Sequence, residues 1–297
     1  MKLVDSHQHV LWHHRNGQGL IDDLDKHEID YAWLLSWLPD PGNAQAHSVT
    51  LNPMNVRLDG TQDGITLRDI VETKEKWPDR FVVGYCPNPR WPEAPEMLRA
   101  AYHMHGARVC AEWKFHLLFD DPRCLEVFKV AGELKMPVVL HLDIPYIKNQ
   151  EGKLEYFEGW FGGTIDNLER ALLACPDTIF IGHAPGFWRE ISADAADCPD
   201  MYPNGPVTMT GRLYGLFEKY PNLYADLSAG SGMTALKRDP KHAIGFIQKF
   251  ADRLLFGRDY YGGDLMEFLQ TLDLDEGIKK KIFQDNAESL VAPPAAS

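Results

Sequence analysis

Eight short apolar segments, each about as long as one β-strand, constrain the fold more than any other feature of the chain. They lie at Lys2–His7, Asp30–Ser36, Arg80–Cys86, Ala107–Phe115, Met136–Leu142, Thr178–His183, Asn222–Ser228 and Arg253–Asp259. Helical patterns lie between them, at Arg123–Lys135, Thr164–Ala174, Met209–Tyr220, Pro240–Phe250 and Leu274–Leu290. Strands that alternate with helices indicate a parallel α/β sheet with right-handed crossovers. Eight repeats favour closure into a (β/α)8 TIM barrel, and an open doubly wound sheet is the alternative.

Three segments that follow predicted strands are unusually long. They are Leu38–Ile65, Asp143–Gly163 and Ala184–Pro206, each rich in Gly, Pro, Asn and Asp. In a barrel, such βα loops lie over the C-terminal face, where active sites are built. We expect a single domain over residues 1–297, with 290–297 as a flexible tail, because barrels of about this length are routine.

Composition and charge limit the classes of function. Lys and Arg number 30 against 43 Asp and Glu, and a net charge of −13 argues against a nucleic-acid partner. The five cysteines form no C-x-x-C pair, which favours a reducing compartment over a disulfide framework. Asp5 interrupts any apolar signal stretch, and no run approaches the ~18 apolar residues of a membrane span. We therefore expect a cytoplasmic protein with a small-molecule substrate, no membrane partner, and loops compatible with a homodimer.

The first predicted strand ends in a pair of histidines, His7 and His9. Side chains two residues apart on a strand point to the same face, so the two imidazoles can bind one ion together. A second pair with the same spacing, His103 and His105, falls between a helix and the next strand. That position is at the opposite, stability face of a barrel, and we interpret this pair as structural.

Three further ionisable residues end predicted strands. His141 ends the fifth, His183 the sixth and Asp259 the eighth. A buried imidazole or carboxylate is costly unless it is paired or bound to a metal. Neutral imidazoles with one carboxylate suit a divalent ion, with Zn²⁺ first and Mn²⁺ second, and an open position for water.

The fourth predicted strand carries a polar stripe. Glu112, Lys114 and His116 share one side of the strand, and apolar residues occupy the other. Because the outer side packs on helices, the polar stripe is expected to point inward, and Asp226 on the seventh strand reaches the interior likewise. Glu112 or Lys114 could bridge a second metal ion. We favour the simpler interpretation, in which they pair with each other or with Asp226.

This ordered set of motifs resembles the amidohydrolase superfamily. The matching residues are Asp5-Ser6-His7-Gln8-His9, His141, His183, Gly257-Arg258-Asp259 and the C-terminal run Ile282-Phe283-Gln284-Asp285-Asn286-Ala287. Within the superfamily, the chain is most similar to the branch that includes aminocarboxymuconate semialdehyde decarboxylase, related aromatic decarboxylases and sugar-acid lactonases. The similarity extends from residue 3 to about residue 290.

The resemblance implies roles for individual residues. His7, His9, His141 and Asp259 would hold one metal ion. His183 would stand beside the metal-bound water as a general base or as an electrophile toward the substrate, and Asp259 or His183 would shuttle the proton in hydrolysis. Two departures from the family concern the substrate: Arg258 stands where a small residue is common, and Ala184–Arg189 replaces a glycine-rich stretch.

Three functional hypotheses follow. The leading one is a metal-dependent hydrolase in which activated water attacks an ester, lactone or amide carbonyl. The second is a non-oxidative decarboxylase of an unsaturated or aromatic acid, in which an arginine (Arg15, Arg189 or Arg258) would bind the carboxylate. The third is a catalytically idle barrel that binds a ligand. Loop residues predict an apolar or ring-shaped substrate: Trp12, Trp37, Met54, Phe157, Trp160, Phe161, Phe187 and Trp188.

Overall fold

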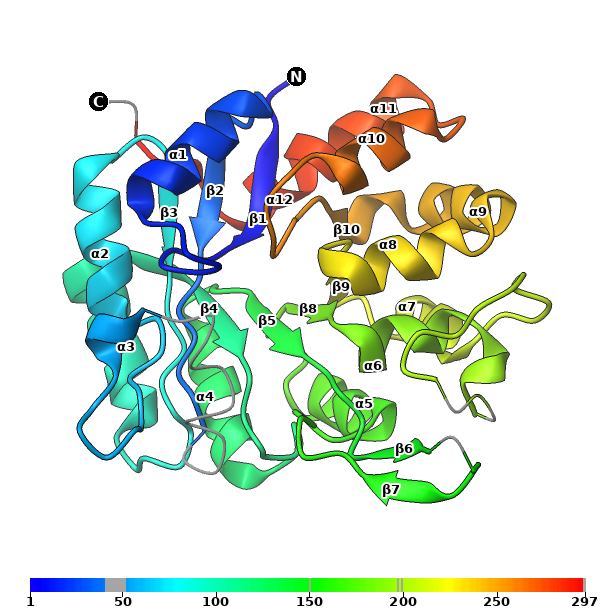
Figure 1. Cartoon of the computed structure of the whole chain (residues 1–297), viewed down its shortest axis with the longest axis horizontal. Coiled ribbons are helices and arrows are strands. Elements are labelled where there is room, and N and C mark those ends of the chain that lie inside the picture. The colour runs from blue at the N-terminus through cyan, green and yellow to red at the C-terminus, as the bar shows by residue number, and fades with distance from the viewer. Residues whose placement is uncertain (41–51, 150, 197, 199, 296–297) are drawn as a thin grey trace.

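Eight parallel strands form a nearly closed barrel with helices around it (Figure 1). The computed structural model describes residues 1–40, 52–149, 151–196, 198 and 200–295, so part of the predicted loop Leu38–Ile65 (residues 41–51) lies outside the described residues. The strands follow one another around the sheet as β1 (Val4–Gln8), β2 (Tyr31–Leu34), β3 (Phe81–Gly84), β4 (Ala107–Trp113), β5 (Val138–His141), β8 (Phe180–His183), β9 (Leu223–Asp226) and β10 (Leu254–Leu255). The predicted TIM barrel is confirmed.

The first strand and the segment after the last strand meet along a seam that closes the barrel. The backbone amide of Ser6 donates to the carbonyl of Phe256 at 2.9 Å, and the amide of Asp259 donates to the carbonyl of His7 at 2.8 Å. Beside these bonds, the buried guanidinium of Arg258 donates to Asp5 Oδ2 at 2.7 Å. The predicted ligands His7, His9 and Asp259 therefore lie on the two segments that these hydrogen bonds join.

Helices surround the barrel, and the predicted segments Arg123–Lys135, Thr164–Ala174, Met209–Tyr220 and Pro240–Phe250 each correspond to one of them. Their bounds are α1 (Gly17–Lys26), α2 (Leu67–Lys76), α3 (Ala94–His105), α4 (Pro122–Glu133), α5 (Ile165–Ala174), α6 (Pro185–Trp188), α7 (Arg212–Lys219), α8 (Ala229–Lys237), α9 (Pro240–Phe250), α10 (Asp264–Thr271), α11 (Glu276–Lys280) and α12 (Asn286–Leu290). Asp121 caps α4 by accepting a bond from the Arg123 amide at 2.9 Å, and Pro122 occupies the first turn.

Several elements differ from the prediction. Helix α8 begins with Ala-Gly-Ser-Gly, a poor helix-forming sequence, and forms because Ser231 and Gly232 are buried against the fold. The predicted helix Leu274–Leu290 is α11 and α12 joined by a π-helical turn over Lys281–Asp285. The loop Asp143–Gly163 contains an antiparallel hairpin of β6 (Tyr146–Lys148) and β7 (Leu154–Tyr156).

Two buried apolar clusters lie on the two sides of the sheet. The larger one fills the space between strands and helices. The other, which we call the inner cluster, fills the barrel with side chains from every strand: Val4, Trp33, Val82, Val109, Ala111, Val139, Ile181, Tyr224 and Leu255. Its members show which side of each strand faces the interior.

The control pair of histidines lies away from the inner cluster. His103 and His105 belong to the last turn of α3, immediately before β4 begins. They are therefore at the amino-terminal end of the barrel strands, as predicted. Among the described residues, no helix is both long and apolar enough to cross a membrane.

Asn286 fastens the C-terminal helix to the barrel, and its removal is predicted to destabilise the fold. Its buried amide donates to the carbonyls of Ala251 and Leu254, both at 2.7 Å. We expect Asn286→Ala to lower the free energy of unfolding by about 1–3 kcal/mol, because two buried carbonyls lose their donor. Denaturant unfolding of Asn286→Ala beside the exposed-site control Asp273→Ala measures this; equal stability of the two variants would contradict it.

Candidate metal centre

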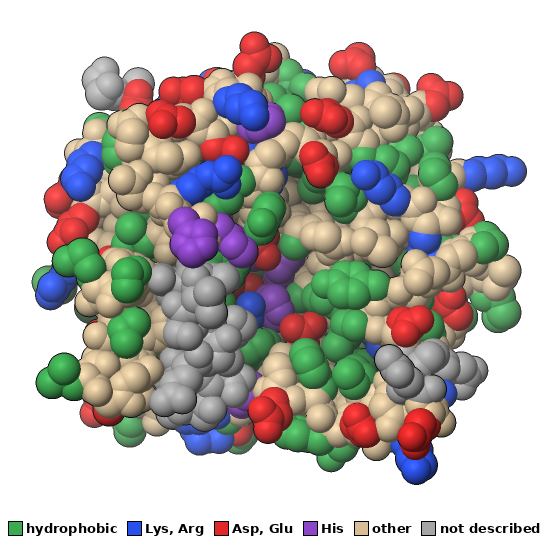
Figure 2. All heavy atoms as spheres, viewed as in Figure 1, with side chains coloured by type: hydrophobic (Ala, Val, Ile, Leu, Met, Phe, Trp, Pro, Cys, Tyr) green, Lys and Arg blue, Asp and Glu red, His purple; other side chains and the backbone are tan. Residues whose placement is uncertain are grey.

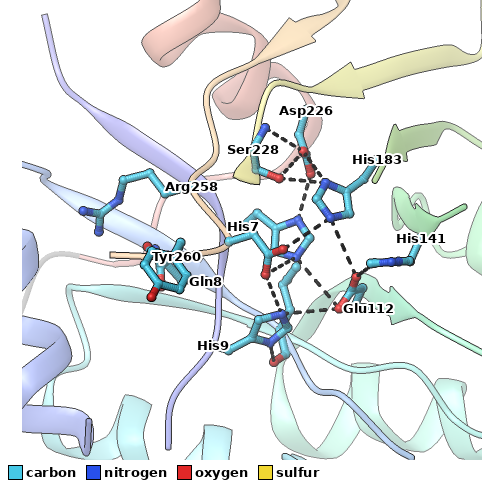
Figure 3. Close-up of polar contacts among 12 residues, drawn as sticks. His7, Gln8, His9, Glu112, His141, His183, Asp226, Ser228, Arg258 and Tyr260 are labelled. Carbon is cyan, nitrogen blue, oxygen red and sulfur yellow. Dashed lines mark hydrogen bonds and ion pairs between the residues drawn. The ribbon is translucent and has the colours of Figure 1, made fainter. Parts of the chain in front are cut away.

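Seven ionisable side chains converge at the carboxyl end of the barrel (Figure 3). They are His7 and His9 from the end of β1, Glu112 from β4, His141 from β5, His183 from β8, Asp226 from β9, and Asp259, which follows β10. Six of them are buried, and the Asp259 side chain is 17% exposed. Figure 2 shows histidine side chains at the bottom of a depression near the centre of this face, with acidic side chains beside them.

Simple strand alternation aims three of these side chains inward. His141 is two residues beyond Val139 of the inner cluster, and His183 is two residues beyond Ile181. Asp226 follows Tyr224 at the same spacing, whereas Asp259 lies beyond the end of β10 and has a left-handed backbone conformation, with φ at 51°. Because successive side chains on a strand point to opposite faces, His141, His183 and Asp226 share the inward side of their strands.

In β1 and β4, a change of strand register brings the polar residues inward. Val4 faces the inner cluster, but His7 is an odd number of residues further on. The pairing of β1 with β2 shifts between Asp5 and Gln8, and that of β4 with β5 shifts between Cys110 and Trp113. In β4 the shift follows Ala111 of the inner cluster, so that Glu112 also reaches the interior. The sequence argument placed Val109 and Ala111 on the outer side with Trp113, and this placement was wrong because it assumed unbroken alternation.

His7, His9 and Asp259 form one compact group of candidate ligands. Asp259 Oδ1 is 3.4 Å from His7 Nε2 and 3.3 Å from His9 Nε2. Each side chain offers a ligand atom within 4.8 Å of the other two. Two imidazoles and a carboxylate are a common donor set for divalent transition metals.

Glu112 and His183 form a second group that shares His7 with the first. Their ligand atoms also lie within 4.8 Å of one another. Glu112 Oε2 is 3.4 Å from His9 Nε2, and Glu112 Oε1 is 4.0 Å from His183 Nε2. The carboxylate of Glu112 therefore borders both groups, whereas the structure gives it no ion pair with Lys114 or Asp226, the partners favoured from the sequence.

The carboxylate of Asp226 contacts the imidazoles of both His7 and His183. Its Oδ2 accepts from His7 Nδ1 at 2.8 Å, and its Oδ1 lies 3.0 Å from His183 Nδ1. Ser228, two residues further along, also contacts His183 Nδ1 at 2.8 Å. Because the Nδ1 atoms are occupied in this way, both Nε2 atoms face the interior of the site, which is the arrangement that a metal-ligating histidine requires.

His141 lies at the edge of the cluster, with both ring nitrogens occupied. Its Nδ1 is 2.6 Å from Glu112 Oε1, and its Nε2 is 2.9 Å from Asp143 Oδ2. His141 is not a member of either compact group, so its role as a ligand stays a prediction. Asp143 did not emerge from the sequence as a site residue, although its position two residues after His141 on the same side of the chain is a usable signal.

The charges of the cluster shift one another's protonation. Burial lowers the pKa of His9, but the carboxylates of Asp259 and Glu112 outweigh burial and raise it to about 9. The pKa of His183 is raised in the same way by Asp226 and Asp259 against the effect of burial. Burial works to raise the pKa of Asp259 and Glu112, but nearby cations, namely imidazoles and, at Glu112, Lys114, hold both values well below the usual range. The ionised carboxylates of the cluster thus favour the protonated forms of His9 and His183.

Three of the arginine and tryptophan side chains expected to contact substrate have partners within the protein instead. Arg258 bonds to Asp5 and to Asp23, each at 2.7 Å. Arg189 donates to the carbonyls of Ala195 and Cys198. Trp188 is 1% exposed and donates to the carbonyl of Asp226 at 3.0 Å.

Arg15 is stacked over the ring of Tyr261 at 3.8 Å, and its contact with substrate stays a prediction. Among the aromatic loop residues, Trp12 and Trp37 lie beside His9, with ring centroids 5.8 and 6.3 Å away. Phe161 lies 5.5 Å from His141. These three rings border the cluster, whereas Phe187 is fully buried and Met54 is 89% exposed.

Comparison with known proteins identifies one family. A family model described as amidohydrolase matches residues 4–292. No curated protein matches the chain.

Solved structures share the fold at low sequence identity. An uncharacterised TIM-barrel protein from Bordetella bronchiseptica is 17% identical over 99% of both chains, with a TM-score of 0.65. A dihydroxybenzoic acid decarboxylase from Polaromonas, solved with manganese and the inhibitor 2-nitroresorcinol, is 15% identical, with 97% of this chain and 96% of that one covered and a TM-score of 0.58. A probable 2-pyrone-4,6-dicarboxylic acid hydrolase from Acinetobacter baumannii, solved with citric acid, is 12% identical over 98% and 99%, with a TM-score of 0.54.

The raised pKa of His9 predicts pH-dependent metal binding. A protonated imidazole cannot ligate, so a cation must displace a proton from His9 at any pH below about 9. We expect the association constant for Mn²⁺ to rise by about tenfold per pH unit from pH 7 to pH 9 and then to level off. Isothermal titration calorimetry in buffers of different ionisation enthalpy measures both the affinity and the released proton. An affinity that stays constant between pH 7 and pH 9 would refute this assignment.

Proposed function

Since this chain belongs to the amidohydrolase family, we propose that it is a metal-dependent hydrolase that opens an ester, lactone or amide bond of a small substrate. The observation that carries the proposal is the Nε2 atom of His7. It is buried and, among the described residues, has no hydrogen-bond partner. It nevertheless faces Asp259 Oδ1 at 3.4 Å and Glu112 Oε2 at 4.0 Å. A buried nitrogen of this kind is costly unless a ligand binds it.

The residues present fit one divalent ion. His7, His9 and Asp259 would hold it, with Glu112 and His183 at its border. Both compact groups use His7, whose Nδ1 is already bonded to Asp226, so a single Nε2 lone pair remains for a metal. One ion therefore satisfies this imidazole. We propose Zn²⁺ first, because it prefers nitrogen ligands with one carboxylate, and Mn²⁺ second.

When bound, such an ion supplies a Lewis acid that polarises a carbonyl and activates water at neutral pH. His183 is placed to move the proton. Its Nδ1 is held by Asp226 and Ser228, and its Nε2 lies 3.4 Å from Asp259 Oδ2. In hydrolysis, the oxygen of water bonds to the carbonyl carbon, and the bond from that carbon to the leaving oxygen or nitrogen breaks. Asp259 or His183 Nε2 takes the proton of water and returns it to the leaving atom.

Decarboxylation is the second candidate, and the protonation of His183 favours it. Its pKa is raised because Asp226 and Asp259 outweigh burial, and this favours the form of the imidazole that can donate a proton. In this reaction, the proton of His183 Nε2 would be delivered to the carbon that bears the carboxylate, and the bond to the carboxylate then breaks to release CO2. The same residues serve both reactions, so the choice depends on the substrate.

Metal content tests the proposed site directly. Elemental analysis of protein purified without a histidine tag is expected to find about one equivalent of zinc or manganese, and His7→Ala or Asp259→Ala to reduce it below about a tenth of an equivalent. The double variant His103→Ala/His105→Ala is the matched control, because it removes the same H-x-H motif at the other end of the barrel. Wild-type protein that takes up neither zinc nor manganese on reconstitution would contradict the proposed metal site.

A substrate panel separates the two reactions. We expect the metal-loaded protein to release acid from lactones and esters, followed by pH-stat titration. Release of CO2 from unsaturated or aromatic acids, with no lactone or ester turned over, would establish the decarboxylase instead. Protein that carries the metal but turns over neither class would argue against both reactions.

Asp226 is predicted to be a positioning residue for His7 and His183. We expect Asp226→Asn to weaken metal binding by about 10- to 100-fold, because an amide cannot accept from two imidazole N–H groups with the strength of a carboxylate. The control is Asp252→Asn, which removes an exposed carboxylate that pairs with Lys281. Calorimetric Mn²⁺ affinities of the two variants decide the matter, and equal values would assign Asp226 a purely structural role.

A further inference from the structure

Arg258 is a buried cation directly before the candidate ligand Asp259, and the proposed chemistry does not use it. Its side chain is 4% exposed, and in Figure 3 it points away from the candidate ligands. The backbone amide of Arg258 donates to Asp5 Oδ1 at 2.9 Å, and its Nε atom donates to Asp5 Oδ2 at 2.7 Å. One carboxylate of β1 therefore holds both the main chain and the side chain of Arg258.

The far end of the same guanidinium binds the turn that follows Asp259. The Nη1 atom of Arg258 donates to the carbonyl of Gly262 at 2.9 Å and to Asp23 Oδ2 at 2.7 Å. The second oxygen of Asp23, in helix α1, accepts from the amide of Gly262 at 3.3 Å. Residues 259–263 form neither a helix nor a strand, so the course of this turn depends on side-chain contacts of this kind.

Asp259 needs such support because its backbone lies in the left-handed region, with φ at 51°. This conformation is disfavoured for residues other than glycine, and it persists where the surrounding contacts enforce it. Arg258 binds the chain on both sides of Asp259, at its own amide and at the carbonyl of Gly262. In this conformation, the carboxylate of Asp259 lies 3.4 Å from His7 Nε2 and 3.3 Å from His9 Nε2.

The geometry of these contacts requires a guanidinium rather than any cation. Asp5 and Asp23 are both buried, and a buried carboxylate is costly unless it is paired. Burial lowers the pKa of Arg258, but these two carboxylates outweigh burial and raise it, so the side chain stays charged. A lysine would supply the charge from a single nitrogen at the end of a flexible chain. It could not donate to Asp5 and Asp23 from two fixed positions, as Nε and Nη1 of Arg258 do.

We propose that Arg258 is a positioning residue for the candidate metal centre. By joining Asp5 of β1 to Asp23 of α1 beside the turn, its guanidinium keeps the carboxylate of Asp259 in the place of a metal ligand. Arg258 itself would contact neither the metal nor the substrate. The inference rests on the proposed function, because it explains how one of the ligands proposed there is held in place.

The test compares two arginine-to-lysine substitutions at opposite ends of the last strand. Arg258→Lys removes the guanidinium contacts and keeps the charge. Arg253→Lys is the matched control, because Arg253 directly precedes β10 and its guanidinium donates to the carbonyls of Phe217 and Tyr220, away from the candidate ligands. Asp23→Asn is the third variant, which weakens the contact in α1 without changing Arg258, and it decides the question if Arg258→Lys does not fold. Each protein is characterised by its calorimetric Mn²⁺ affinity, the electron paramagnetic resonance spectrum of bound Mn²⁺, the midpoint of thermal unfolding and a metal-free crystal structure.

We expect both lysine variants to lower the midpoint of thermal unfolding, because each loses hydrogen bonds inside the protein. Arg258→Lys should also weaken Mn²⁺ binding by about 10- to 100-fold and alter the resonance spectrum, and Asp23→Asn should act in the same direction. Arg253→Lys should leave both properties of the bound metal unchanged. In the metal-free crystal of Arg258→Lys, the Asp259 carboxylate should move by about 1 Å or more from its place beside His9.

An Arg258→Lys protein with the Mn²⁺ affinity of the wild type, or with an unmoved Asp259 carboxylate, would overturn the inference. An equal loss of Mn²⁺ affinity in Arg253→Lys would also overturn it, because the effect would then follow from stability alone. Wild-type protein that binds no metal would contradict the proposed function instead, and the metal-free crystal structures would still decide the role of Arg258.

Discussion

The carboxylate of Asp226 is the contact on which the arrangement of the site depends. It is fully buried at the centre of the barrel, and it bonds to the Nδ1 atoms of His7 and His183 from strands on either side. An isolated carboxylate in this position would be expensive, and these two imidazoles make its ionised form stable. In return, the carboxylate fixes which nitrogen of each ring faces Asp259. The orientation of both imidazoles toward the candidate ligand groups follows from that one carboxylate.

Much of the site was readable from the sequence because three strands obey strict alternation. In β5, β8 and β9, a residue of the inner cluster is followed two positions later by His141, His183 or Asp226. The barrel itself was predicted from eight apolar segments of strand length that alternate with helices. The ionisable residues at the ends of these segments were then expected to lie together at the carboxyl end of the barrel. The control pair His103 and His105 was correctly placed away from the site by the same logic of strand direction.

The remaining features depend on contacts that alternation does not encode. The register shifts in β1 and β4 change which residues face inward, and they arise from pairing with neighbouring strands rather than from local pattern. Arg258 was a reasonable candidate for binding substrate until its two partners, Asp5 and Asp23, were located more than two hundred residues earlier in the chain. Helix α8 was missed because its glycines are poor helix formers that tertiary packing stabilises.

The seam that closes the barrel has a consequence for the durability of the protein. His7 and His9 lie on one side of the seam and Asp259 on the other, and the bond from the Asp259 amide to the His7 carbonyl joins them. An ion held by these residues would span the junction between the two ends of the sheet. Separating these two segments and releasing the ion would then be the same event. A bound ion would therefore slow the separation of the first and last strands, and with it the unfolding of the barrel.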